Sequence, residues 1–228
     1  MEVNFVMNFQ EYADREMLVM DVANALAGDL KTALLHHDSV SFVVPGGTTP
    51  GPIFDILCAA DIEWNRVHIM LSDERWVPDD HPRSNAKLLR ERLLVDRAKA
   101  ARFTPFFVAD VDVLQACSDV SKTLLPELPI SVSMLGMGAD MHTASLFPSA
   151  RGLAEALSAD ALALCPIQAE GQEQRVTLSG PILNNAIAKH IVIFGDDKRN
   201  ALNVAKGSSP EVAPVNAVLN GTTIHWAA

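Results

Sequence analysis

The sequence predicts a single α/β domain over residues 1–228, built as three layers with a mostly parallel sheet between helices. Short apolar segments rich in valine and isoleucine alternate with segments whose apolar residues recur every three or four positions. This alternation is typical of parallel sheets, in which a helix connects one strand to the next. The length of 228 residues fits one such domain and is short for two.

The first predicted element is a helix over residues 10–36. Leucine or valine recurs there at every fourth position and gives the helix one apolar face, at Leu18, Val22, Leu26, Leu30 and Leu34. Residues 39–47 predict a strand that ends in two glycines, and residues 48–60 predict a helix with prolines in its first turn. These elements form a strand, Gly-rich turn and helix after the first helix.

The same alternation predicts the remaining elements. Strands are expected at 66–73, 130–138, 161–166, 189–195 and 222–227, and helices at 84–94, 113–125, 181–188 and 197–205. Because parallel strands point the same way, the loops that follow them meet at one edge of the sheet, where ligands of such folds bind. We expect the loops at 79–82 and 166–174 to be mobile segments above that edge.

Charge and composition exclude several classes of partner. The 28 acidic residues outnumber the 18 basic ones and give a net charge of −10, the wrong sign for binding a nucleic-acid backbone. No apolar stretch approaches the roughly 18 residues that span a membrane. Cys58, Cys117 and Cys165 are odd in number and far apart, which favours buried thiols over disulfides or a metal site. We therefore expect a cytoplasmic protein that binds neither nucleic acid nor membrane.

Four strand ends carry polar sequence that suits a binding site. The first is the loop at 45–50, where Gly46 and Gly47 allow close approach to a ligand and Thr48 and Thr49 offer hydroxyl donors. A helix start directly after the loop favours an anion there. The loop lacks the lysine of a P-loop, which argues against a nucleotide.

The second and third strand ends supply acids, a cation and a base. Asp73 stands where the strand at 66–73 ends, and Arg75 follows it closely. His142 comes directly after another predicted strand, with Asp140 two positions before it. Histidine suits a general base at neutral pH, so we expect His142 to be the base and Asp140 or Asp73 to orient it or a water molecule. Arg75 is a candidate to stabilise a negative oxygen.

The fourth feature is a pair of cations, Arg175 and Lys198, near later predicted strand ends. If both face the loop at 45–50, they form a clamp for a phosphate group. The chain has no HExxH motif, no paired Cys/His and no clustered carboxylates, so we expect no metal and no cofactor. It has no GxSxG either, which argues against a serine hydrolase.

Three segments together resemble the glucosamine-6-phosphate isomerase/6-phosphogluconolactonase family: VPGGTTP, SDERWVPDDHPRSNAKLLRERLL and LGMGADMHTASLFP. RVTL and GDDK resemble its later motifs, so the resemblance runs from about Val43 to Lys206. Within the family, the three segments look like those of the lactonases. The resemblance implies a Rossmann-like fold and hydrolysis of 6-phospho-D-glucono-1,5-lactone to 6-phospho-D-gluconate, the second step of the oxidative pentose phosphate pathway.

One residue departs from the family pattern. The family commonly has glycine between Asp140 and His142, whereas this chain has Met141. If the backbone there needs a positive φ, a residue with a side chain costs roughly 1 to 2 kcal/mol. The orientation of His142 therefore depends on this position.

Three functions are compatible with a sugar-phosphate site: a lactone hydrolase, an isomerase or deaminase of amino-sugar phosphates, and a sensor without catalysis. The isomerases look as though they supply a carboxylate shortly after the histidine, but no Asp or Glu lies between His142 and Glu155. A sensor has no need of His142. The hydrolase is therefore the expected function, with a small phosphosugar lactone as its partner and a monomer or homodimer as its form.

Overall fold

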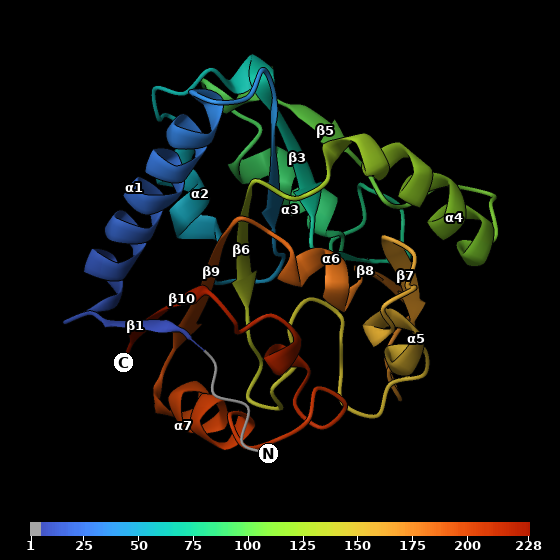
Figure 1. The fold of residues 1–228 in the computed structure, drawn as a ribbon. Helices are drawn as coiled ribbons and strands as arrows, with labels where there is room; N and C mark the ends of the chain where they lie inside the picture. Colours follow the sequence, from blue (N-terminus) through green and yellow to red (C-terminus); the bar gives the residue numbers. More distant parts are fainter. Residues whose placement is uncertain (1–5) are drawn as a thin grey trace.

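The computed structural model describes residues 6–228 and confirms the predicted α/β architecture. The main sheet consists of β1 (Asn8–Glu11), β2 (Val40–Val44), β3 (Val67–Leu71), β5 (Arg102–Thr104), β6 (Val132–Gly136), β9 (Ala188–Phe194) and β10 (Thr222–Ala227). These strands lie in the order β1-β10-β9-β6-β2-β3-β5, and every neighbouring pair is parallel (Figure 1).

Helices cover both faces of this sheet. α1 (Arg15–Leu34) and α2 (Gly51–Leu57) lie on one side and α4 (Val113–Leu124) lies on the other (Figure 1). The remaining helices are α3 (Asn85–Arg92), α5 (Leu153–Leu157), α6 (Gly180–Asn184) and α7 (Asp196–Ala205). No helix within residues 6–228 is long and apolar enough to cross a lipid bilayer.

The first helix differs from its prediction at the N-terminal end. The residues spaced four apart are buried as expected. The helix begins at Arg15, however, because the side chain of Asp14 accepts a hydrogen bond from the N–H of Met17 at 2.8 Å and caps it. Residues Asn8–Glu11 form β1, an edge strand whose four residues are all exposed, so no alternation of buried apolar residues predicts it.

A second sheet of three strands lies beside the main one. In it, β8 (Arg175–Leu178) pairs antiparallel with both β4 (Asp73–Arg75) and β7 (Leu164–Ile167). The expectation that 161–166 joins the parallel sheet is therefore wrong. A loop as short as 168–174 allows two strands to pair only as an antiparallel hairpin, since a parallel pair needs a crossover of a dozen or more residues. Residues of both sheets share one hydrophobic core.

The strand order places a crevice at the carboxyl ends of β2 and β6. From β2 the chain continues to β3 on one side, and from β6 it continues to β9 on the other side. Where two neighbouring strands have connections that diverge in this way, their loops separate and leave room for a ligand. The Gly-Gly loop follows β2 and the loop that carries His142 follows β6, so both flank the crevice.

Candidate active site

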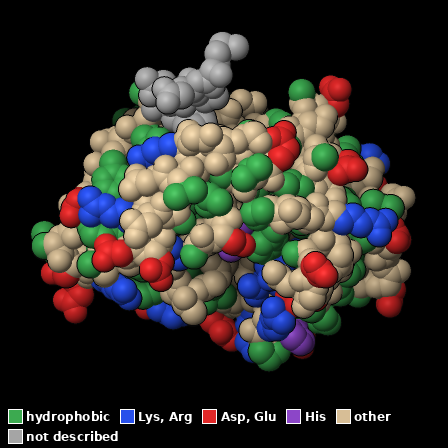
Figure 2. Space-filling model, turned by 90° about the horizontal axis from the view of Figure 1, so that it is seen from below, with side chains coloured by type: hydrophobic (Ala, Val, Ile, Leu, Met, Phe, Trp, Pro, Cys, Tyr) green, Lys and Arg blue, Asp and Glu red, His purple; other side chains and the backbone are tan. Residues whose placement is uncertain are grey.

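A pocket of about 240 Å³ opens at this crevice. The loops after β2 and β6 line it, together with residues of β4, β8, α3 and α7. Figure 2 looks onto this end of the molecule, where Lys, Arg and His side chains lie beside a hollow in the surface. The pocket brings together all of the predicted site residues except Asp140: Gly46, Gly47, Thr48, Thr49, Asp73, Arg75, His142, Arg175 and Lys198.

The two glycines shape the wall of the pocket after β2. A Cβ on Gly46 would lie 1.8 Å from Oδ1 of Asn85, so any other residue there would have to displace the Asn85 side chain. Gly47 has a φ of +88°, which favours glycine. Asn85 is a pocket residue that the sequence analysis missed: its Nδ2 donates to the carbonyl of Asp73 at 2.8 Å, which connects the start of α3 to β4, and its side chain lies beside Gly46.

His142 and Asp140 form a pair in the loop after β6. The Nδ1 of His142 lies 2.5 Å from Oδ1 of Asp140. This hydrogen bond lowers the pKa of Asp140. Because an ionised carboxylate only accepts, Nδ1 carries the proton and Nε2 is left with a free lone pair. A Cβ on Gly138 would lie 2.2 Å from Nδ1, so glycine at that position makes room for the pair.

Met141, between these two residues, has the left-handed conformation that the family's glycine suits. Its φ is +67°, and its carbonyl accepts a hydrogen bond from the N–H of Val215 at 3.0 Å. The turn that directs His142 into the pocket is therefore present in this chain. Its backbone is more strained with Met141 than it would be with glycine.

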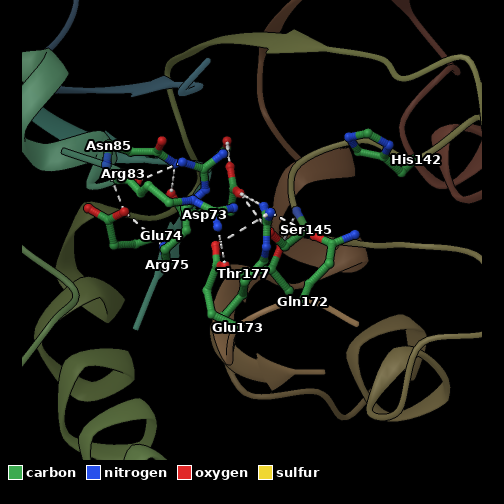
Figure 3. Close-up of polar contacts among 12 residues, drawn as sticks. Asp73, Glu74, Arg75, Arg83, Asn85, His142, Ser145, Gln172, Glu173 and Thr177 are labelled. Carbon is green, nitrogen blue, oxygen red and sulfur yellow. Dashed lines mark hydrogen bonds and ion pairs between the residues drawn. The ribbon is translucent and has the colours of Figure 1, made fainter. Parts of the chain in front are cut away.

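Asp73 belongs to a different part of the site from His142 (Figure 3). Its Oδ1 accepts from Ser72 at 2.8 Å and its Oδ2 accepts from the hydroxyl of Ser145 at 2.6 Å. Nη1 of Arg175 lies 3.9 Å from the same Oδ2. Of the two acids left open by the sequence, Asp140 is the one that contacts His142.

Arg75 and Arg175 lie beside each other on neighbouring strands of the small sheet. They are partners in the register of β4 and β8, and both line the pocket. Burial lowers the pKa of Arg175, and the charge of Arg75 lowers it further. Within the described residues, the Nε atoms of both arginines are buried without a hydrogen-bond partner. Arg175 is buried and Arg75 is half-buried, and two neighbouring cations with unused donors indicate a site for an anion.

Lys198 enters the pocket from the first turn of α7. Burial lowers the pKa of its ammonium group, and the nearby carboxylate of Asp140 opposes this decrease. The pocket therefore holds a second cationic position on the side of the His142–Asp140 pair.

Glu74 has a structural role that the sequence analysis also missed. It is fully buried and accepts hydrogen bonds from the N–H groups of Arg75, Asn85 and Ala86 and from the hydroxyl of Ser84, at 2.7 to 3.0 Å. Burial raises the pKa of its carboxyl, and these hydrogen bonds oppose the increase. Alternation along β4 explains the difference: Asp73 and Arg75 face the pocket, and Glu74 points away from it into the start of α3.

Known proteins resemble this chain over nearly its whole length. A protein named 6-phosphogluconolactonase from Mesorhizobium japonicum is 38% identical and covers 96% of this chain and 95% of its own. One with the same name from Pseudomonas aeruginosa is 38% identical over 90% of this chain and 88% of its own. The crystal structure of a 6-phosphogluconolactonase from Shewanella baltica matches 99% of this chain and 100% of its own with a TM-score of 0.94 and 29% identity.

The family model described as "Glucosamine-6-phosphate isomerases/6-phosphogluconolactonase" matches residues 13–226, which include every residue of the pocket. The resemblance of the three segments is thereby confirmed, and so is the Rossmann-like fold that it implied. This chain belongs to the glucosamine-6-phosphate isomerase/6-phosphogluconolactonase family.

Proposed function

We propose that this chain hydrolyses 6-phospho-D-glucono-1,5-lactone to 6-phospho-D-gluconate, the second step of the oxidative pentose phosphate pathway. The observation that carries the proposal is the His142–Asp140 pair in one pocket with Arg75 and Arg175, whose Nε donors are unused. A base and free cationic donors match a substrate with an ester carbonyl and a phosphate. The names of the relatives that match nearly the whole chain support the same reaction.

In the proposed reaction, a water molecule attacks the lactone carbonyl. Nε2 of His142 takes a proton from the water as the new C–O bond forms, and Asp140 stabilises the resulting imidazolium. The bond between the carbonyl carbon and the ring oxygen then breaks, and His142 returns the proton to that oxygen. Arg75, or N–H groups of the glycine turns, stabilises the negative oxygen of the tetrahedral intermediate. Asp73 acts on the other side of the pocket, where it orients Arg175 through Ser145.

We assign the phosphate to the loop at 46–49 together with Arg175 and Lys198. An acidic protein repels a dianion at long range, so binding depends on a local group of donors. These residues line one pocket, which supports the assignment. Arg75 is the alternative cation for the phosphate, because it is the partner of Arg175 in the pairing of β4 with β8.

The reaction needs neither a metal nor a cofactor, and we expect activity to survive dialysis against EDTA. We place the enzyme in the cytoplasm. Cys58, Cys117 and Cys165 are free and buried, and burial raises the pKa of Cys117 to about 12, so these thiols suit a reducing compartment and take no part in the proposed chemistry.

A direct assay tests the function. The purified protein is given freshly prepared 6-phospho-D-glucono-1,5-lactone, and the rate is corrected for spontaneous hydrolysis. A parallel reaction contains glucosamine 6-phosphate and is followed for ammonia. We expect turnover of the lactone alone; ammonia release would assign the chain to the deaminases, and binding of 6-phospho-D-gluconate without turnover in either assay would identify a sensor.

A further inference from the structure

We propose that the ion pair between Arg83 and Glu173 positions both pocket arginines for the anionic end of the substrate, an inference that rests on the proposed function. It takes the alternative in which Arg75 joins Arg175 at the phosphate and the N–H groups of the glycine turns stabilise the negative oxygen. Nη1 of Arg83 lies 2.8 Å from Oε2 of Glu173 (Figure 3). Arg83 belongs to the loop between β4 and α3, and Glu173 belongs to the loop between β7 and β8. The pair therefore connects two segments that are about ninety residues apart and that both adjoin the pocket.

Each of these loops holds one arginine. Nη1 of Arg75 donates to the backbone carbonyl of Arg83 at 2.6 Å, so the position of that loop sets the direction of the Arg75 guanidinium. Nη2 of Arg175 donates to Oε1 of Gln172 at 2.7 Å, and Oε1 of Glu173 lies 3.8 Å from the same nitrogen. The Arg83–Glu173 ion pair thus holds the two loops together, and with them the groups that contact the guanidinium groups of the two pocket arginines.

The arginines need such a link because they repel each other. They occupy partner positions on neighbouring strands, where like charges are unfavourable. Asp73 and Glu173 both offset this repulsion at Arg175, and Glu173 is the one that also reaches the other loop. Its Oε2 binds Arg83, while its Oε1 is buried beside Arg175 and has no hydrogen-bond partner within the described residues. Without the pair, we expect the guanidinium groups to move apart and to lose the arrangement that an anion requires.

The expected effect is on binding and is moderate in size. The side chain of Arg83 is 56% exposed and that of Glu173 is 23% exposed. The coupling energies measured for partly exposed pairs correspond to about two- to fivefold in affinity. Because the pair contacts no reacting atom, the change belongs in KM for the phosphorylated lactone, and kcat should stay within about twofold of wild type.

Three single variants, one double variant that combines Arg83→Met with Glu173→Gln, and one control test the proposal. Arg83→Met keeps the aliphatic stem and removes the charge, Glu173→Gln keeps the shape, and Arg83→Lys restores a cation. The control is Arg97→Met, which breaks the exposed Arg97–Asp61 pair, neither member of which lines the pocket. Thermal unfolding of each variant is measured beside the kinetics.

We expect KM to rise about two- to fivefold in Arg83→Met and in Glu173→Gln, with no further rise when both are combined. Arg83→Lys and Arg97→Met should resemble wild type, and KM for non-phosphorylated glucono-1,5-lactone should not change in any variant. Additive losses in the double variant, a fall in KM, or equal losses on both lactones would overturn the proposal. If the wild type does not turn over the lactone, the proposed function fails, and calorimetric titration with inorganic phosphate applies the same comparison to the ion pair alone.

Discussion

At the scale of single residues, the contact between His142 and Asp140 decides which ring nitrogen is able to act as a base. Asp140 occupies Nδ1, so only Nε2 is available to a water molecule. Removing the ring removes both the base and the acid that later protonates the ring oxygen. The other groups that stabilise the oxyanion remain in place.

We therefore expect His142→Ala to lower kcat by roughly 10² to 10⁴, with a smaller change in KM. The measurement is the initial rate of lactone hydrolysis after subtraction of the spontaneous reaction, which is fast. A variant that is folded and keeps more than half of the wild-type kcat would exclude His142 as the base.

A variant of Lys198 tests whether this residue contacts the phosphate group or the reacting end of the substrate. Removing one member of a charge-assisted contact costs roughly 1.5 to 3 kcal/mol, or about 10- to 150-fold in affinity. We expect Lys198→Ala to weaken binding of the phosphorylated lactone by an amount in this range. Activity on glucono-1,5-lactone, measured in parallel, should be poor and nearly unchanged. Equal losses on both substrates would show that Lys198 acts on the fold or on the chemistry. The phosphate site would then be assigned around Arg75.

Met141 offers a test of backbone strain beside the catalytic histidine. Alanine is ordinarily more stable than glycine, but at a φ of +67° the order should reverse. Both Met141→Gly and Met141→Ala lose the partly buried side chain, so their difference isolates the backbone.

We expect Met141→Gly to be more stable than Met141→Ala by about 1 to 2 kcal/mol in urea unfolding. Ala25→Gly, in the middle of α1, is the matched control and should be destabilising, as glycine is in ordinary helices. If Met141→Ala is the more stable of the two, the left-handed turn before His142 is not present in solution.

At the scale of secondary-structure elements, Glu74 is the connection between β4 and α3. One buried carboxylate satisfies N–H groups at the start of the helix and the hydroxyl of Ser84, and the same helix start places Asn85 against Gly46. Loss of Glu74 leaves these donors without a partner in a buried place.

We expect Glu74→Ala to lower the free energy of unfolding by about 2 to 4 kcal/mol, since each unpaired buried donor costs about 1 to 3 kcal/mol and part of this is recovered by relaxation. Glu91→Ala on the exposed face of α3 is the control and should change it by less than about 0.5 kcal/mol. Similar values for the two variants, from urea unfolding, would contradict the capping role.

At the scale of the whole molecule, a chain of hydrogen bonds with two buried histidines at its centre connects the edge of the sheet to α1. Asp29 of α1 contacts His190 at 2.7 Å, His190 contacts His225 at 3.0 Å, and His225 contacts the hydroxyl of Tyr12 at 2.8 Å. Burial lowers the pKa of His225 from 6.5 to about 4, and the neighbouring His190 contributes to this decrease.

This pKa predicts how the stability of the molecule depends on pH. Between about pH 6.5 and pH 4 the unfolded chain binds a proton at position 225 that the folded chain does not, so the free energy of unfolding falls as the pH falls. The loss at pH 4 should approach roughly 3 kcal/mol. Urea unfolding of wild type and His225→Gln across this range tests it, and we expect a shallower slope in the variant. Equal slopes would show that His225 is not the group responsible.

Local patterns in the chain were sufficient to predict the longer strands and helices and the segments of the site, whereas the short elements β1, β5, β8 and α5 were missed. The Gly-Gly loop, His142 and the cations all follow or adjoin predicted strands, and the crevice does collect them. Periodicity and turn chemistry operate over a few residues, so a single sequence displays them directly. The three resembling segments also identified the family, because motifs in a fixed order are specific even where each one is weak.

Pairings between distant segments were decided by the tertiary structure alone. The sequence left Asp73 and Asp140 as equal candidates, and placed residues 161–166 in the wrong sheet; the structure gives Asp140 to His142 and brings Arg75 beside Arg175. The role of Glu74 as the buried acceptor at the start of α3 likewise depends on a contact between two segments. Which face of a short strand is buried, and which segment lies next to it, depends on the packing of the whole core and not on the residues of the strand itself.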